Sequence, residues 1–175
     1  MSRLIILTTL VIITFGSCKQ QTESKATEKE SITSVYYLIR HAEKDRSDPD
    51  NKDPLLTEEG EARAQRWSAY FDSISLDAVY STSYNRTYST ARPTAGKKGI
   101  AVIPYNVQYI VSPAFKNDTR GKKVLVVGHS NTTPTLANSL MGSERFPYMD
   151  DNDNSSLYVV TITDSLADVQ VRTVE

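Results

Sequence analysis

The sequence is poor in the residues that build metal sites and disulfides, with one cysteine and two histidines among 175 residues. The single cysteine, Cys18, has no partner for a disulfide within the chain, and so few soft ligands cannot form a structural zinc site. Acidic segments at 48–53 and 150–154 lack the glycine and the distant glutamate of a calcium loop of the EF-hand type. We therefore expect neither a metal nor a cofactor.

An excess of charge is also lacking, because the formal net charge is −1. This balance gives no basis for a nucleic-acid surface. It does not exclude a small phosphorylated ligand, since net charge says nothing about the arginines around one pocket. The length, with 39% hydrophobic and 23% charged residues, is typical of one soluble domain with a real core.

No apolar run is long enough for a membrane-spanning helix, but a shorter run occupies residues 4–15. It follows Arg3 and precedes Gly16 and Ser17, which is the layout of a secretory signal. With Cys18 next, the segment resembles a bacterial lipobox, although Phe15 stands where leucine is usual. We expect a signal peptide at 1–17, a lipidated Cys18 opening a flexible polar tether at 18–33, and a domain at 34–175. The alternative is a plain signal peptide that leaves an incidental thiol.

The lipobox interpretation predicts where the domain resides. A lipid on Cys18 would anchor the chain to a membrane of the bacterial cell envelope, with the domain facing the periplasm.

Beyond residue 34, strand-like apolar runs alternate with segments of helical period. We expect a three-layer α/β/α sandwich with a mostly parallel central sheet and an antiparallel C-terminal strand. Thr57 is expected to cap the first helix, Pro93 to end or kink the second, and Thr133 to cap the third with Pro134 as its first residue. The predicted strands are 35–39, 76–82, 99–106, 122–129, 155–163 and 168–174, and the predicted helices begin near 57, 83 and 133.

Polar residues follow three of these strands at their carboxyl ends, where ligands bind in open α/β sheets. If the first and fourth strands are parallel neighbours, the chain's two imidazoles face each other across one crevice. Two guanidiniums beside them suit a phosphate. Each residue alone could instead be a solvated loop residue or a structural histidine. The set consists of Arg40, His41, Arg86, His129, Ser130 and Asn131.

Four segments, in this order, resemble the motifs of the histidine phosphatase superfamily, which includes the phosphoglycerate mutases. They are "LIRHAEK", "DPLLTEEGEARA", "YSTSYNRTYSTARPTA" and "VLVVGHSN", and they span about residues 35–131. Each motif alone is weak, whereas the ordered set is specific. The chain is most similar to compact members of branch 1 with an Arg-His-Ala-Glu-Lys segment, in which Ala42 replaces the usual glycine.

The resemblance implies a phosphatase that needs no metal and hydrolyses a phosphomonoester or related phosphoryl compound. His41 would be the nucleophile that forms a phosphohistidine, and Arg40, Arg86 and His129 would hold the phosphoryl oxygens. Substrate binding would also involve Ser130, Asn131 and Lys44. The substrate would be a phosphorylated small molecule or a phosphoprotein.

The general acid stays open. Larger members carry a proton-donating glutamate between the third and fourth strands, but residues 104–123 contain none. Glu43 or Asp45 could serve, although loop solvation explains both, or the leaving group could depart unprotonated. The missing acid also motivates an alternative, a non-catalytic module that binds or senses a phospho-ligand. A phosphomutase is disfavoured, because the short insertion leaves the pocket open.

Overall fold

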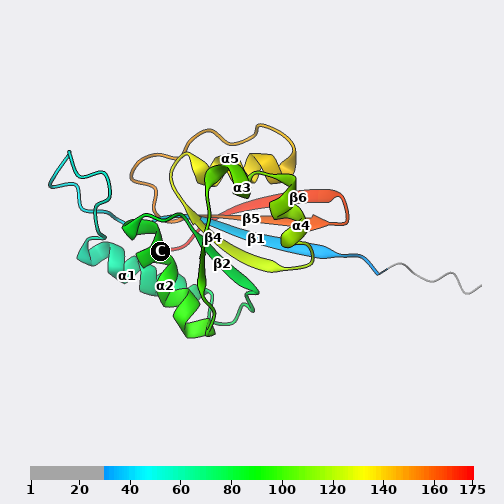
Figure 1. The fold of residues 1–175 in the computed structure, drawn as a ribbon, viewed down its shortest axis with the longest axis horizontal. Helices are drawn as coiled ribbons and strands as arrows, with labels where there is room; N and C mark the ends of the chain where they lie inside the picture. Colours follow the sequence, from blue (N-terminus) through cyan, green and yellow to red (C-terminus); the bar gives the residue numbers. More distant parts are fainter. Residues whose placement is uncertain (1–29) are drawn as a thin grey trace, which may run out of the picture. The chain divides into compact units, whose positions relative to one another are not determined.

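Six strands form one mixed sheet in the computed structural model, which describes residues 30–175 (Figure 1). The predicted signal peptide, Cys18 and most of the predicted tether lie outside these residues. Within them, no helix has the length and apolar character needed to cross a membrane. The strands are β1 (Thr33–Arg40), β2 (Ala78–Ser81), β3 (Val102–Pro104), β4 (Lys123–Gly128), β5 (Ser156–Thr163) and β6 (Leu166–Thr173).

The sheet has the order β3-β2-β4-β1-β5-β6. The four strands β1 to β4 pair in parallel, whereas β5 runs antiparallel to β1 and β6 antiparallel to β5. The predicted mostly parallel sheet and the C-terminal hairpin are therefore confirmed. The register of β1 and β4 matters most, because it pairs Arg40 with Gly128. The residues that follow, His41 and His129, consequently leave the sheet side by side.

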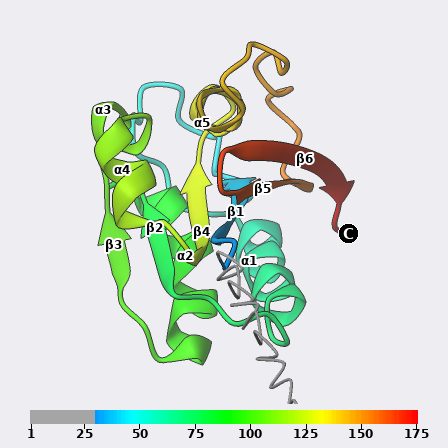
Figure 2. The ribbon, with the colours of Figure 1, turned by 90° about the vertical axis from the view of Figure 1, so that its right-hand side faces the viewer.

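Helices cover both faces of the sheet, as the three-layer prediction requires (Figure 2). Helices α1 and α2 pack with one face, and α3, α4 and α5 pack with the other. Their bounds are α1 (Glu58–Tyr70), α2 (Asn85–Lys98), α3 (Val107–Ile110), α4 (Pro113–Asp118) and α5 (Thr132–Met141).

Alternate residues of β1 enter two separate apolar cores. Leu38 packs in the core under α5, which contains Leu136. Its neighbour Ile39 packs in the core under α1, which contains Trp67 and Phe71. A strand covered on both faces needs apolar side chains at successive positions, which explains the continuous apolar run that precedes Arg40.

The predicted start of the first helix was right, whereas the predicted end of the second helix and start of the third were wrong. Pro93 does not end the second helix: α2 continues to Lys98 and ends at Gly99, which has a left-handed φ of 67°. Alanines on both sides of Pro93, Ala91 and Ala95, are buried in the core, and this packing offsets the hydrogen bond that proline removes. Thr57 caps α1 as predicted, accepting a hydrogen bond from Gly60 N at 3.1 Å.

The third predicted helix starts earlier than expected. Asn131, not Thr133, precedes the first helical residue, and its side-chain oxygen accepts from Thr132 N at 2.9 Å. Pro134 is therefore the third residue of α5, a position where the missing N–H still has no intrahelical partner to lose. Helices α3 and α4 were not predicted, although Asn106 and Ser112 cap them in the usual way.

Candidate active site

A cavity of about 380 Å³ opens at the carboxyl ends of β1, β2 and β4. Among the described residues, the structure brings together every residue predicted for the phosphoryl site except the two candidate acids, Glu43 and Asp45. The predicted residues on its wall are Arg40, His41, Lys44, Arg86, His129, Ser130 and Asn131, and they are joined by Thr82, Tyr84, Val107, Thr132 and Asp151.

His41 is held from several sides and is only 3% exposed. Its backbone N–H donates to Gly128 O at 2.9 Å, and its carbonyl accepts from the side chain of Asn154 at 2.7 Å. The ring nitrogen Nδ1 lies 2.7 Å from the carbonyl of Ala42. Because a carbonyl oxygen can only accept, Nδ1 carries the proton and Nε2 keeps its lone pair. The ring is thus fixed in the tautomer that a nucleophilic Nε2 requires.

The His41 ring is also kept uncharged. Burial lowers the pKa of His41 from 6.5 to about 3, and the positive charges of Arg40 and Arg86 and the neighbouring His129 act in the same direction. The hydrogen bond to Ala42 opposes this shift but does not outweigh it. Burial is therefore the largest cause of the neutral ring, ahead of the neighbouring arginines. A neutral imidazole is the nucleophilic form.

The His129 ring lies edge-on to the His41 ring, with 5.5 Å between the centroids. Burial, followed by the charges of Arg86 and Arg40, lowers the pKa of His129 to about 4. Its backbone N–H donates to Thr132 Oγ1 at 2.8 Å, so the turn into α5 fixes its position. Both imidazoles of the chain therefore face the same small space, as the sequence predicted.

Arg40 is 1% exposed, so its charge needs partners. One guanidinium nitrogen donates to the carbonyl of Asp150 at 2.9 Å, and the other to the carboxylate of Asp151 at 2.6 Å. Asp151 also pairs with Arg46. Burial lowers the pKa of Arg40, and the negative charge of Asp151 opposes that shift. The connection between α5 and β5 thus orients Arg40 towards the cavity.

Arg86 is 9% exposed and sits in the first turn of α2. Its guanidinium lies 4.3 Å from the centre of the Tyr84 ring and donates to the carbonyl of Lys52 at 3.3 Å. The carboxylate of Asp53 is 3.5 Å away. An arginine is disfavoured at the positive end of a helix, and these contacts offset that cost.

Three buried polar atoms on the cavity residues have no hydrogen-bond partner within the described part of the chain. They are Nε of Arg40, Nε of Arg86 and Nε2 of His129. Buried polar atoms are normally paired. Two guanidiniums and an imidazole around one space suit the tetrahedral, doubly charged phosphoryl group.

Thr90 ties the His41 segment to α2. Its hydroxyl accepts from Ala42 N at 2.9 Å and donates to the carbonyl of Arg86 at 2.7 Å. One buried side chain therefore links the loop that carries His41 to the helix turn that carries Arg86.

Glu43 is not at the cavity, which corrects its inclusion among the candidate site residues. Its carboxylate receives Nε of Arg63 at 2.6 Å, and the side chain lines a separate surface pocket. Asp45 is exposed, and its carboxylate caps the turn by accepting from Ser47 N. Loop and ion-pair roles therefore account for both acids.

Two glycines of the motif segments permit close approaches at the site. A Cβ on Gly60 would lie 2.1 Å from the carbonyl oxygen of Glu43, two residues beyond His41. A Cβ on Gly128 would lie 2.7 Å from Thr132 Oγ1, the group that holds the His129 backbone. Both motif glycines thus permit close packing against the segments that follow His41 and His129, and neither is needed for a special backbone angle.

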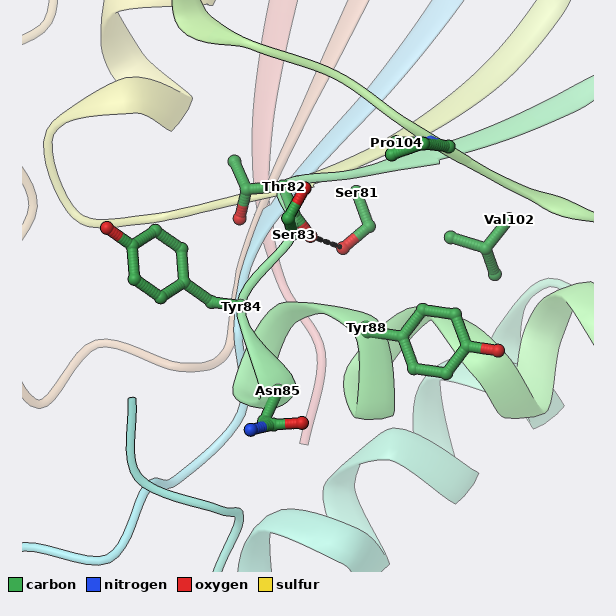
Figure 3. Close-up of a pocket in the computed structure, with 8 residues that line it drawn as sticks. All are labelled: Ser81, Thr82, Ser83, Tyr84, Asn85, Tyr88, Val102 and Pro104. Atoms are coloured by element: carbon green, nitrogen blue, oxygen red, sulfur yellow. Dashed lines mark hydrogen bonds between the residues drawn. The ribbon is translucent and has the colours of Figure 1, made fainter. Parts of the chain in front are cut away.

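A second cavity, of about 350 Å³, adjoins the first (Figure 3). Thr82 and Tyr84 line both spaces. The Tyr84 ring lies at one end of the group, and Tyr88 and Val102 lie at the other. We call this space the β3–α2 groove; Ser81, Ser83, Asn85 and Pro104 complete its wall.

Sequence reasoning missed several residues that shape the site. Asp151 and Asn154 were considered only within a segment weighed as a calcium motif, Asp53 within another such segment and a motif segment, and Thr90 only within a motif segment, none with a role of its own. No local signal identifies them, because each acts on a partner at least 33 residues away in sequence. Tyr84 could have been found, since it stands two residues before Arg86 in a motif segment. No group of three or more potential metal ligands occurs among residues 30–175.

Comparison with known proteins agrees with this geometry. Residues 36–107 match the family described as the histidine phosphatase superfamily (branch 1). No curated protein sequence matches the chain.

Solved structures with the same fold include several phosphatases. The alpha-ribazole phosphatase of Shigella flexneri has a TM-score of 0.64 and 16% identity, over 79% of this chain and 96% of that one. The protein histidine phosphatase SixA, complexed with tungstate, gives the same values. A mycobacterial glucosyl-3-phosphoglycerate phosphatase has a TM-score of 0.58 and 12% identity, over 83% of this chain and all of that one.

The fold and the paired imidazoles define an α/β protein with a cavity of two histidines and two arginines at its strand ends. The similarity to branch 1 of the histidine phosphatase superfamily lies in residues 36–107, and the fold is shared with the solved phosphatase structures named above.

Proposed function

We propose that this protein is a phosphatase that hydrolyses a phosphomonoester, or a related phosphoryl compound, through a phosphohistidine on His41. The observation that carries the proposal is the fixed tautomer of His41 beside His129 and two buried arginines. The relatives named above, all phosphatases, support the reaction class.

In the first step, the lone pair on Nε2 of His41 attacks phosphorus. The bond from phosphorus to the leaving oxygen breaks, and the leaving group departs with that electron pair. Arg40, Arg86 and His129 offset the charge on the phosphoryl oxygens during the transfer, which is mainly a matter of positioning and electrostatics. No metal is required in this scheme, because the positive charge comes from side chains.

In the second step, water attacks the phosphohistidine. The phosphorus–nitrogen bond breaks, its electron pair returns to Nε2, and inorganic phosphate is released with the proton lost by water. Splitting one difficult displacement into two steps is the advantage of a covalent intermediate.

The leaving group receives no obvious proton from a carboxylic acid. Among the described residues that line the cavity, Asp151 is the one carboxylate, and hydrogen bonding to Arg46 holds its pKa below the usual value. An ionised carboxylate cannot donate a proton. We therefore propose that good leaving groups, such as those of a phosphohistidine, an acyl phosphate or an aryl phosphate, are the preferred ones.

The test is to incubate the purified chain with para-nitrophenyl phosphate and trap the protein in alkali during turnover. We expect phosphate release and a phosphorylated peptide that contains His41. The missing acid favours a second candidate, a module that binds a phospho-ligand without turnover. A phosphomonoester that binds at the cavity and remains uncleaved would favour that module and contradict the phosphatase.

We also propose that a lipid on Cys18 anchors the protein to a bacterial envelope membrane, with the domain in the periplasm. The order Arg3, apolar run, Gly16, Ser17 and Cys18 supports this. Metabolic labelling with a radioactive fatty acid should mark the wild type and not Cys18→Ser. Equal labelling of the two proteins would contradict the anchor.

A further inference from the structure

The β3–α2 groove differs chemically from the first cavity, which His41 and His129 line and which we call the phosphoryl cavity. None of the groove's eight lining residues, all in the described part of the chain, carries a charge. The phosphoryl cavity, in contrast, contains two arginines, a lysine and an aspartate. A charged leaving group would therefore gain no ionic partner from the wall of the groove.

The wall of the groove offers ring surfaces and hydroxyl groups instead. Tyr88, which is 50% exposed, projects along the groove towards Val102 (Figure 3). Pro104, at the end of β3, adds apolar surface, while Thr82 and Ser83 add hydroxyls at the junction with the phosphoryl cavity. Apolar walls with a few convergent polar groups bind uncharged organic ligands, and aromatic side chains favour ligand rings.

The groove shares Thr82 and Tyr84 with the phosphoryl cavity, and neither His41 nor His129 lines it. The rings of His41, His129 and Tyr84 follow one another edge to face, with centroid separations of 5.5 and 5.2 Å. Tyr84 therefore bounds the phosphoryl cavity beyond His129, on a side distinct from the nucleophile. In-line transfer places the leaving oxygen opposite the attacking nitrogen, so substituents on that oxygen point away from His41.

We infer that the β3–α2 groove binds the leaving group of the substrate, and that this leaving group carries an uncharged ring. The inference rests on the proposed phosphatase function and narrows it to one substrate class: phosphomonoesters of uncharged phenols, whose oxygens are good leaving groups. Tyr84 separates the two binding spaces, and Tyr88 contacts the ring.

Two non-hydrolysable probes test this binding without depending on turnover. Ethylphosphonate and 2-phenylethylphosphonate have the same anionic head and differ by one phenyl ring. Calorimetric titration of the full chain should give a Kd for 2-phenylethylphosphonate that is roughly 3- to 10-fold lower, the range expected for one aromatic contact.

Three variants test whether the groove causes the difference in Kd between the two phosphonates. Tyr88→Ala should bring the two Kd values within about twofold of each other, because the aromatic contact is lost. Tyr88→Phe keeps the ring and should keep the preference. Tyr148→Ala is the matched control, because Tyr148 is 72% exposed and lines neither cavity, and it should change nothing.

Equal affinity of the wild type for the two phosphonates would overturn the inference, as would an unchanged preference in Tyr88→Ala. These outcomes are separate from a failure of the proposed function. If the phenyl preference is present but para-nitrophenyl phosphate is not cleaved, the groove stands as a ligand site and the phosphatase proposal falls.

Discussion

A histidine follows each of the neighbouring strands β1 and β4, but the protein fixes the two histidines differently. At the end of β1, the backbone N–H, the carbonyl and Nδ1 of His41 are all engaged by the protein. At the end of β4, the backbone of His129 is fixed, but the buried Nε2 has no protein partner among the described residues. The difference supports the proposed division of labour, in which His41 attacks phosphorus and His129 binds a phosphoryl oxygen.

The largest effect is expected from His41→Ala. Removing the nucleophile removes the covalent route, so phosphate release from para-nitrophenyl phosphate should fall by about 10⁴-fold or more. Stopped-time assays with the purified variant measure this, and calorimetric binding of phosphate checks that the cavity is intact. A variant that keeps a tenth of the activity would assign the attack to another group.

His129→Ala should cost less, about 10²- to 10³-fold in kcat, the range for losing one hydrogen-bond donor to a transition state. The phosphohistidine should still form on His41, only more slowly, and trapping during single turnover measures its rate. His129→Asn restores an N–H donor and should recover part of the loss. If the two histidine variants are equally inactive, the division of labour is wrong.

Gly60→Ala should destabilise the segment that follows β1, although Gly60 lies in helix α1. The added methyl group would meet the carbonyl of Glu43, so the free energy of unfolding should fall by about 2–3 kcal/mol. Gly96→Ala is the matched control: it is also helical and has no atom within 4 Å of the new Cβ. That variant should be more stable by about 0.5–1 kcal/mol. Urea unfolding of the three proteins distinguishes them, and equal stability would contradict the close approach.

The last prediction concerns pH. The folded pKa values of His41 and His129, about 3 and 4, lie below the unfolded value of 6.5. As pH falls below 6.5 the unfolded chain takes up protons first, so stability present above pH 6.5 is lost on acidification. Each histidine contributes a slope of at most about 1.4 kcal/mol per pH unit.

Urea unfolding at pH 7 and pH 5 measures this loss. A double variant, His41→Ala with His129→Ala, should lose less stability over the same interval, because the chain has no other histidine. Nuclear magnetic resonance should show both rings neutral at pH 5 in the wild type. A ring that titrates near 6.5 would mean that its surroundings are more solvated than the structure indicates.

Much of the fold followed from local patterns. The strand runs ending in Arg40 and Gly128 were expected in one mostly parallel sheet. The structure shows that the two strands are neighbours, which was only a condition in the sequence argument, and their register brings the two histidines together. The end of α2 was predicted wrongly because burial of Ala91 and Ala95 outweighs the helix-breaking tendency of Pro93.

The parts of the site that sequence reasoning missed are contacts between distant segments. Asp151 reaches Arg40 across 111 positions, and Arg63 reaches Glu43 across 20. A sequence displays which residues can pair but not which of many acids and bases meet. For that reason Glu43 was a reasonable candidate acid until its partner was known.

Cleavage of the loop from Asp150 to Asn154 would be one way to inactivate the proposed site. Through backbone carbonyls and two side chains it grips Arg40 and the carbonyl of His41. A single proteolytic nick in this loop would leave every strand pairing intact, yet it would release the guanidinium that faces the phosphoryl cavity. The position of Arg40 at the carboxyl end of β1 therefore depends on an acidic loop that is not part of the sheet.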